Sequence, residues 1–316
     1  MHAWYFSDAN LGPPVGVAQG EGNRPLYGTI SAAGFATPAR RAPGFGSVVR
    51  VSDRSGDRSF TLAVQLRKQF GDRVEGSASY GYTRARDRMS LVNAEEAFAN
   101  LQNTPLNGTL EDRTLGTSYF EIPHRVEVSG VARLPYQVRL SLLYAGASGT
   151  PFTYTITGDA NADGIGSGPL VNDIVYVPRD SLDIALANPA DWSTLDRFIE
   201  TESCLRRQRG RILARNSCRN PWFGTLNARV TKGFATVSGQ SLEVTADVYN
   251  ALNLVNRRWG QSRLTALNPP AQPMLQLVGY DASAGRGVYR LQLPGLRQIQ
   301  DLASRWQMEL SVRYVF

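Results

Sequence analysis

Three oxygen-bearing side chains stand at alternate positions in one short segment of the sequence. Asp159, Asn161 and Asp163 are followed by Gly164, and this spacing matches the first half of a calcium-binding loop. Side chains spaced in this way converge on one point, while the glycine lets the chain turn sharply. The chemistry that this segment offers is the binding of a hard cation by oxygen ligands.

The second half of the segment departs from the calcium pattern. Leu170 occupies the twelfth position, where such loops carry glutamate, and the nearest carboxylate comes three residues later. The alternative is a polar turn capped by its own side chains. Apart from this Ca²⁺ we expect no cofactor. The calcium hypothesis predicts as ligands Asp159, Asn161, Asp163, the carbonyl of Ile165, and Asp173.

Cys204 and Cys218 are the only two cysteines of the chain. They do not suit zinc, because there is no Cys-x-x-Cys pattern and no neighbouring histidine. We predict a disulfide between them, which would place the segment in an oxidising compartment. Closing a loop of this length contributes about 3 kcal/mol in the chain-entropy model. Two unrelated thiols are the alternative.

Six arginines lie within or beside this cysteine loop, in a chain whose net charge is +7. Such a cluster suits lipopolysaccharide phosphates, another anionic ligand or nucleic acid. No aromatic side chains are interleaved for base stacking, so we expect no nucleic-acid partner. The alternative is a solvated loop that pairs with acids such as Glu200 and Glu202. The six are Arg206, Arg207, Arg209, Arg211, Arg215 and Arg219.

Catalysis finds little support in the sequence. The two histidines, His2 and His124, are isolated, and no HExxH, GxSxG or phosphate-loop pattern occurs. We therefore expect that the protein is not an enzyme.

Alternation of apolar and polar residues over long stretches is the dominant pattern. The longest of these stretches run for about 11 to 13 residues, whereas ordinary strands average about five or six. One apolar and one polar face over this length is typical of a strand that crosses a bilayer in a barrel. A soluble sandwich would explain the alternation but not the length. Seven stretches qualify, 58–70, 73–84, 125–134, 138–144, 225–234, 242–248 and 306–316, with a partial one at 3–6.

The connections between these stretches alternate in length. Short turns at 71–72, 135–137 and 237–240 alternate with long segments at 87–123, 149–221 and 253–304. Outer-membrane barrels have short periplasmic turns and long extracellular loops in this order. No window approaches 18 consecutive apolar residues, which excludes a transmembrane helix.

The last stretch resembles the C-terminal signature of bacterial outer-membrane proteins. Apolar or aromatic residues occupy alternate positions up to a terminal phenylalanine, and the resemblance implies recognition by the barrel-assembly machinery. The residues that carry it are Trp306, Met308, Leu310, Val312, Tyr314 and Phe316.

Three further segments narrow the resemblance. They are Ser148–Phe152 with Gly158–Gly164, the cysteine loop from Cys204 to Trp222, and Ala246–Asn253. Together they resemble the barrel of TonB-dependent receptors of the Oar-like kind. That resemblance implies a 22-stranded barrel with an N-terminal plug, which imports a nutrient such as a carbohydrate or peptide with energy from the inner-membrane TonB complex.

We therefore expect an all-β, antiparallel transmembrane β-barrel in the outer membrane of a Gram-negative bacterium. Residues 1–316 hold seven to eight spanning strands and no export signal, TonB box or plug, so we expect the C-terminal section of one larger barrel domain. Outer-membrane lipid and lipopolysaccharide are the expected surroundings, and the imported ligand is open. Two alternatives are a stand-alone pore or adhesin of eight to ten strands and a soluble calcium-stabilised β-sandwich.

Overall fold

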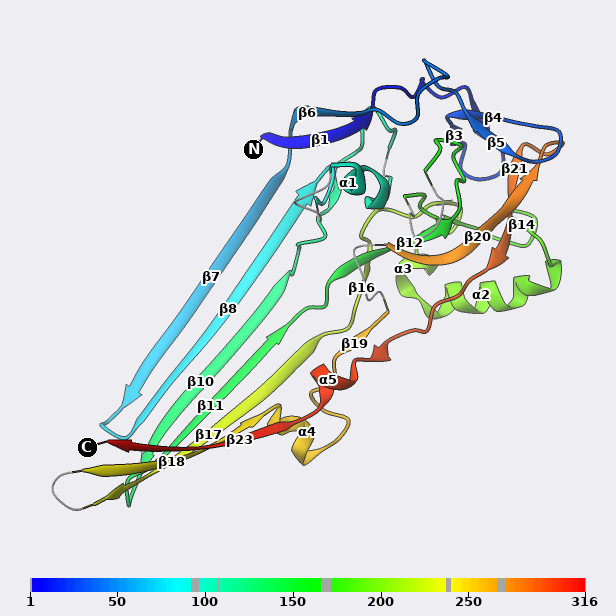
Figure 1. Ribbon diagram of the computed structural model, residues 1–316. Helices are drawn as coiled ribbons and strands as arrows, with labels where there is room; N and C mark the ends of the chain where they lie inside the picture. The colour runs from blue at the N-terminus through cyan, green and yellow to red at the C-terminus, as the bar shows by residue number, and fades with distance from the viewer. Residues whose placement is uncertain are drawn as a thin grey trace.

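Seven long strands pair side by side into one antiparallel sheet, which we call the wall (Figure 1). The computed structural model describes residues 2–91, 97–106, 108–165, 172–236, 240–265 and 271–315. Each wall strand pairs with the next long strand along the chain, and the two-residue β9 (Gly116–Thr117) pairs with the upper end of β8. In spatial order the strands are β7 (Arg58–Phe70), β8 (Val74–Asp87), β10 (His124–Leu134), β11 (Val138–Ala147), β17 (Phe223–Ala235), β18 (Ser241–Tyr249) and β23 (Gln307–Val315).

The register of the wall brings the apolar positions of all seven strands onto one face. Val64 lies opposite Tyr80, which lies opposite Val126, and at the far side Val244 lies opposite Val312. Side chains on this apolar face are exposed, with Val312 at 69%. In a soluble sandwich a second sheet would cover such a face, so the exposure favours a face that contacts lipid.

The height of the apolar face matches a bilayer. Phe60 and Phe70 mark its two ends on β7, ten residues apart. That span is about 34 Å along a strand, and the tilt usual in barrels reduces it to roughly 25 Å, the height of the apolar band of outer-membrane barrels.

Aromatic rings collect at the upper end of this face, the end of the long connections. Phe60 lies 6.5 Å from Tyr82 and Tyr82 lies 5.6 Å from His124, measured between ring centroids. The Tyr80 hydroxyl lies 2.8 Å from Nδ1 of His124. We call these four residues the upper aromatic belt, because rings of this kind mark the membrane interface.

Cations and rings mark the lower end, where the short turns lie. Lys68 lies over the ring of Phe70 at 5.0 Å, and Lys232 lies over the ring of Phe234 at 5.3 Å. Long cationic side chains at this depth extend their charge to the interface and cover apolar surface with their stems.

Two of the three short turns are described. Strand β8 begins at Val74, so the first turn comprises residues 71–73 and is one residue longer than predicted. The second is tight because Tyr136 and Gln137 both have positive φ, 61° and 59°. Of the third, residues 237–239 lie outside the described residues.

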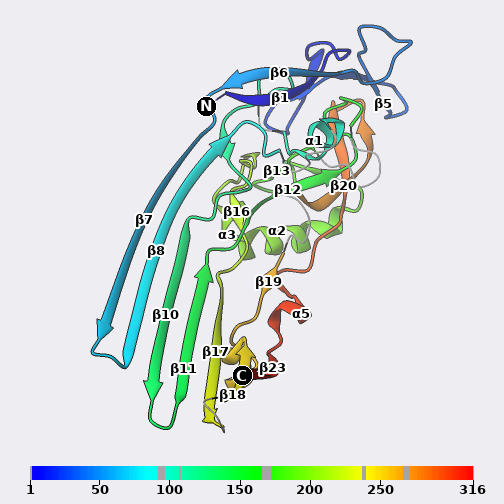
Figure 2. The ribbon, with the colours of Figure 1, turned by 60° about the vertical axis from the view of Figure 1, so that its left-hand side comes forward.

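The long connections fold into a separate layer at the upper end of the wall, which we call the cap (Figure 2). Its five-stranded sheet consists of β14 (Ala185–Leu186), β21 (Arg286–Leu291), β20 (Ala271–Asp281), β12 (Pro151–Thr157) and β16 (Cys218–Arg219). η1 (Pro189–Asp191), α2 (Trp192–Thr201) and α3 (Ser203–Arg206) lie beside it. The main buried core of the described residues lies here, and it includes Phe152, Tyr154, Ile156, Leu195, Ile199, Leu205, Leu275 and Tyr289.

The first residues cross the upper end rather than extending the wall. The partial strand expected at 3–6 is β1 (His2–Asp8), and it pairs with β6 (Val49–Ser55). Within the described residues this segment is short and pairs with β6, so it adds no spanning strand to the wall. The other short elements are β2 (Gly16–Ala18), β3 (Arg24–Leu26), β4 (Gly28–Ile30), β5 (Ala36–Pro38), α1 (Ala97–Asn103), β13 (Tyr176–Val177), β15 (Arg211–Ile212), α4 (Ala251–Val255), β19 (Arg263–Leu264), β22 (Gln298–Ile299) and α5 (Asp301–Ser304).

Among the described residues, no helix combines the length and the apolar character that a membrane crossing would need.

Two adjacent leucines of β11 test which face meets lipid. Leu142 lies on the apolar face, and Leu143, 37% exposed, lies on the polar face opposite Asn227. We expect Leu142→Arg to destabilise the folded barrel by about 2–4 kcal/mol and Leu143→Arg to leave it nearly unchanged, because only the first places a charge in hydrocarbon. Urea titration in lipid vesicles measures both, and equal losses would contradict the assignment of the faces.

Candidate functional site

The polar face of the wall carries two adjoining grooves of about 450 and 430 Å³ that share Glu127. The first is lined by Arg125, and the second contains an ion pair in which Nε of Arg229 lies 2.6 Å from Oδ1 of Asp247. Mixed charges of this kind line water-filled interiors. The polar face therefore offers binding surface to a hydrophilic ligand.

The cap folds over the polar face and is tied to it. Asp87, at the upper end of β8, alternates with the apolar-face residues and so belongs to the polar face. Its carboxylate lies 2.6 Å from the fully buried guanidinium of Arg215, which comes from the cap. Breaking such a buried pair leaves an unpaired charge, so this contact fixes the cap on the wall.

The predicted disulfide between Cys204 and Cys218 is confirmed. It joins helix α3 to strand β16, with the two Cα atoms 5.2 Å apart, and both cysteines belong to the buried core of the cap. The bridge connects the helical and sheet layers of the cap.

The six arginines of the cysteine loop do not form one cationic patch. Arg209 pairs with Asp196 and Glu200 at 2.6 and 2.8 Å, and Arg219 pairs with Glu121 at 2.8 Å. The alternative of a solvated loop predicted that these arginines pair with Glu200 and Glu202. The pairing of Arg209 with Glu200 agrees with it, whereas the buried carboxylate of Glu202 pairs with Arg297, which lies outside the loop.

The loop predicted to bind calcium is closed by its own hydrogen bonds. The Asp159 carboxylate accepts the backbone N–H groups of Asp163 and Gly164 at 2.9 and 2.8 Å, and the Asp163 carboxylate accepts that of Ile165 at 2.7 Å. The Asp173 carboxylate accepts the N–H of Ala160 at 2.7 Å. Gly164 has a φ of 85°, as the predicted sharp turn requires.

The three carboxylates of this loop are poorly solvated. Burial raises the pKa of Asp159 to about 7, and the Asp163 carboxylate adds to the shift. Burial also raises the pKa of Asp163, and it raises that of Asp173 well above the ordinary value although Arg24 opposes the shift. A cation or a bound proton would relieve this arrangement.

Calcium binding stays a prediction. Among the described residues, no group of three or more His, Cys, Asp or Glu side chains has a metal-binding arrangement. Leu170 lies outside the described residues. Oδ1 of Asp173 accepts no hydrogen bond although it is buried, and Nη1 of Arg24 is 3.7 Å away.

A polar cavity of about 210 Å³ lies beside this loop, and no pattern in the sequence predicts it. Its polar lining comes from Arg24, Tyr27, Asn161 and Asp173, which belong to segments far apart in the chain. Arg24 also lies 3.2 Å from the buried Glu21, and Glu21 accepts a hydrogen bond from Tyr289 at 2.7 Å. These contacts join the first residues to the cap sheet.

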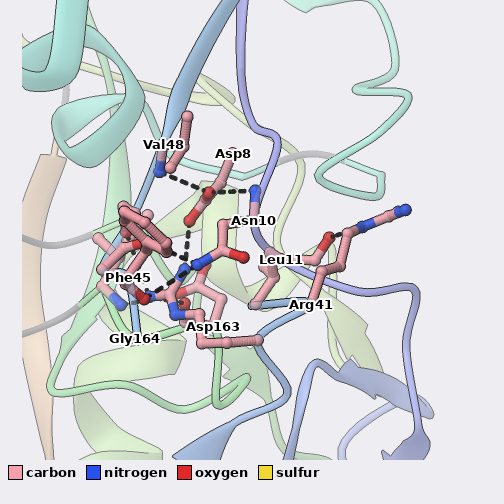
Figure 3. A network of polar contacts seen from close by, with 12 residues as sticks. Asp8, Asn10, Leu11, Arg41, Phe45, Val48, Asp163 and Gly164 are labelled. Carbon is pink, nitrogen blue, oxygen red and sulfur yellow. Dashed lines mark hydrogen bonds and ion pairs between the residues drawn. The ribbon is translucent and has the colours of Figure 1, made fainter. Parts of the chain in front are cut away.

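A second polar network anchors the N-terminal segment (Figure 3). The Asp8 carboxylate pairs with Arg40 and accepts the backbone N–H groups of Asn10 and Val48, each at 2.9 Å. Nη2 of Arg40 lies 3.5 Å from the backbone oxygen of Asp163. The predicted calcium loop is therefore a junction between the N-terminal segment and the cap.

The residues of the expected assembly signal lie along the last strand. Met308, Leu310, Val312 and Tyr314 face Val248, Ala246, Val244 and Leu242 across the β18–β23 pairing, all on the apolar face. Trp306 precedes β23, and Phe316 lies outside the described residues.

Comparison with known proteins agrees with this architecture. A family model described as outer membrane beta barrel domain matches residues 2–262, which include six of the seven wall strands. The chain belongs to the outer membrane beta barrel domain family. It resides in the outer membrane of Gram-negative bacteria, as this family does, and its apolar face meets lipid. Among curated proteins, none matches the sequence.

The raised pKa of Asp159 predicts a pH dependence for the cap of this outer-membrane protein. Between the unfolded pKa of about 3.9 and the folded pKa of about 7, the folded loop holds a proton that the unfolded loop has lost. The stability contributed by this group therefore falls as the pH rises through that window, by an amount on the order of a few kcal/mol. Urea titration in detergent, followed by near-UV circular dichroism at pH 5 and pH 8, measures it. We expect Asp159→Asn to reduce the loss of unfolding stability between pH 5 and pH 8. An equal loss in the variant and the wild-type protein would contradict the raised pKa of Asp159.

The calcium prediction is tested in the same assay at pH 8, where the loop carboxylates are most ionised. We expect millimolar Ca²⁺ to raise the unfolding midpoint of the cap, because a ligand that binds only the folded state stabilises it. Asp163→Asn should abolish this rise, and Asp281→Asn, at an exposed turn, should retain it. An unchanged midpoint in the wild-type protein would show that the segment is a self-capped turn.

Proposed function

We propose that this chain supplies part of the wall and the extracellular cap of a TonB-dependent receptor that imports a nutrient across the outer membrane. The proposal rests on the open wall, the ordered cap and the grooves on the polar face of the wall. A resemblance to Oar-like receptors points to this class of receptor. The segments that carry it are Gly158–Gly164, Cys204–Trp222 and Ala246–Asn253.

The pairing of the wall is the observation that carries the proposal. Seven antiparallel strands run alternately up and down, so the two edge strands, β7 and β23, run in the same direction. An antiparallel barrel cannot close by pairing these two edges. Within the described part of the chain no further strand spans the bilayer, so closure requires an odd number of additional strands. A barrel larger than these seven strands is therefore favoured.

The cap supports selective uptake rather than free diffusion. Its buried core, its disulfide and the Arg215–Asp87 pair hold it over the polar face. An open pore has no need of such a structure, whereas a receptor that captures a scarce ligand needs a preformed surface at the exterior. We infer that the ligand is hydrophilic, because the grooves on the polar face of the wall carry Arg125, Glu127 and the Arg229–Asp247 pair.

Two further partners belong to the proposal. The alternating residues of β23 suit recognition by the barrel-assembly machinery, and energy would reach the receptor through parts of the TonB system that contact a plug. A stand-alone pore or adhesin is the competing candidate, and it would need its closing strands from outside the described residues.

Conductance and energy dependence separate the two candidates. The gene product, purified from outer membranes, is placed in a planar bilayer, and labelled oligosaccharides and oligopeptides are offered to cells that express it. We expect no steady open channel, together with uptake that stops when a protonophore removes the inner-membrane gradient. A stable conductance, or uptake that persists with the protonophore, would contradict the receptor and support the pore.

A further inference from the structure

Three arginines lie together on the apolar face at the upper end of the wall. Arg58 on β7 lies directly opposite Arg86 on β8, and Arg84 lies opposite Phe60. With Ser59 and Phe60 they line a hollow of about 420 Å³. We call Arg58, Arg84 and Arg86 the upper arginine cluster.

The position of the cluster relative to the membrane follows from the register. Its three residues share the alternation of Phe60, Leu62 and Tyr82, so they project from the face that meets lipid. Arg84 lies level with Phe60 of the upper aromatic belt, and Arg58 and Arg86 lie just beyond it, on the side of the long connections. That height is where the headgroups of the outer leaflet begin.

No protein group neutralises this cluster within the described part of the chain. None of the three guanidinium groups makes an ion pair or hydrogen bond to a described residue, whereas Arg215, Arg219 and Arg229 each pair with a carboxylate. The nearest acids in sequence are engaged elsewhere. Asp57 accepts the backbone N–H of Arg88 at 3.1 Å, and Asp87 pairs with Arg215.

Like charges directly opposite one another destabilise a sheet unless an anion lies between them. Guanidinium groups bind phosphate through two parallel hydrogen bonds, and here three of them converge on one hollow at headgroup height. The lower end of the same face differs, because its cations are the separate Lys68 and Lys232, each over its own ring. Only the upper end has the charge density for a multiply phosphorylated headgroup.

We propose that the upper arginine cluster binds the phosphate groups of the outer-leaflet glycolipid, lipopolysaccharide, from the lipid side of the barrel. The hollow between β7 and β8 takes a phosphorylated sugar of the lipid anchor, and the Phe60 side of the hollow contacts its apolar part. This site is separate from the cap and from the polar face, so it serves anchoring in the membrane and not ligand uptake.

Lipid binding by arginine variants tests the proposal. The full chain, purified in mild detergent, is titrated with bisphosphorylated lipid A and with dephosphorylated lipid A. We expect roughly a fivefold loss of affinity for bisphosphorylated lipid A in R84Q and roughly a hundredfold loss in R58Q/R84Q/R86Q, because each cation at a charged leaflet is worth about a factor of five. R58K/R84K/R86K should keep most of the affinity, which separates lost charge from misfolding. Dephosphorylated lipid A should bind equally weakly to all of them.

The matched control is R125Q, which removes an arginine from the polar face at a position that pairs with Gly81, three residues below Arg84 on β8. It should bind lipid A as the wild-type protein does. The proposal is overturned if the triple glutamine variant keeps wild-type affinity, if R125Q loses as much, or if dephosphorylated lipid A binds as well as the bisphosphorylated form. Equal competition by phosphatidylglycerol would also overturn it, because the site would then be a general anion site.

Discussion

Every backbone N–H and C=O group inside a bilayer must find its partner within the protein, and the rest of this structure depends on that constraint. The wall meets it through strand pairing, and pairing fixes which side chains share a face. Because the side-chain period is two, a slip of one residue at any pairing would move Val64 or Leu142 to the polar face and bring polar side chains into lipid. Register therefore decides where the grooves, the aromatic belt and the arginines lie.

The cap is stabilised differently from the wall, because it lies in water and has a buried apolar core. Its stability combines apolar packing around Tyr154 and Leu205 with charges that are buried yet paired, such as Glu21 with Arg24 and Asp87 with Arg215. Buried pairs contribute little net stability, because desolvation offsets their attraction, but they tolerate only one arrangement of the segments that they join. The N-terminal segment, the predicted calcium loop and the cap sheet thus share one geometry.

The wall could be predicted from the sequence because its signal is local. Alternation over residues 58–70 is visible without knowledge of any partner, and the two cysteines left one simple pairing. The cap could not be predicted in this way. Strand β12 is buried on both faces, so it does not alternate, and it pairs in parallel with β20, more than 100 residues later. The cavity beside Asp173 needs Arg24 and Tyr27, whose proximity no spacing reveals. The separate ion pairs of the arginines in the cysteine loop could not be predicted for the same reason. The acid that pairs with Arg215, for example, lies 128 residues away in the sequence.

The distribution of the two kinds of cation has a consequence for the chemistry of the cell surface. Lys68 and Lys232 are the only lysines of the chain, and both lie at the end of the wall nearest the short turns. All the positive charge that the cap presents to the exterior is guanidinium. Acylating reagents and reducing sugars, which react with primary amines, meet no lysine side chain there. Within this chain, the outward-facing surface therefore carries its positive charge without a lysine ammonium group.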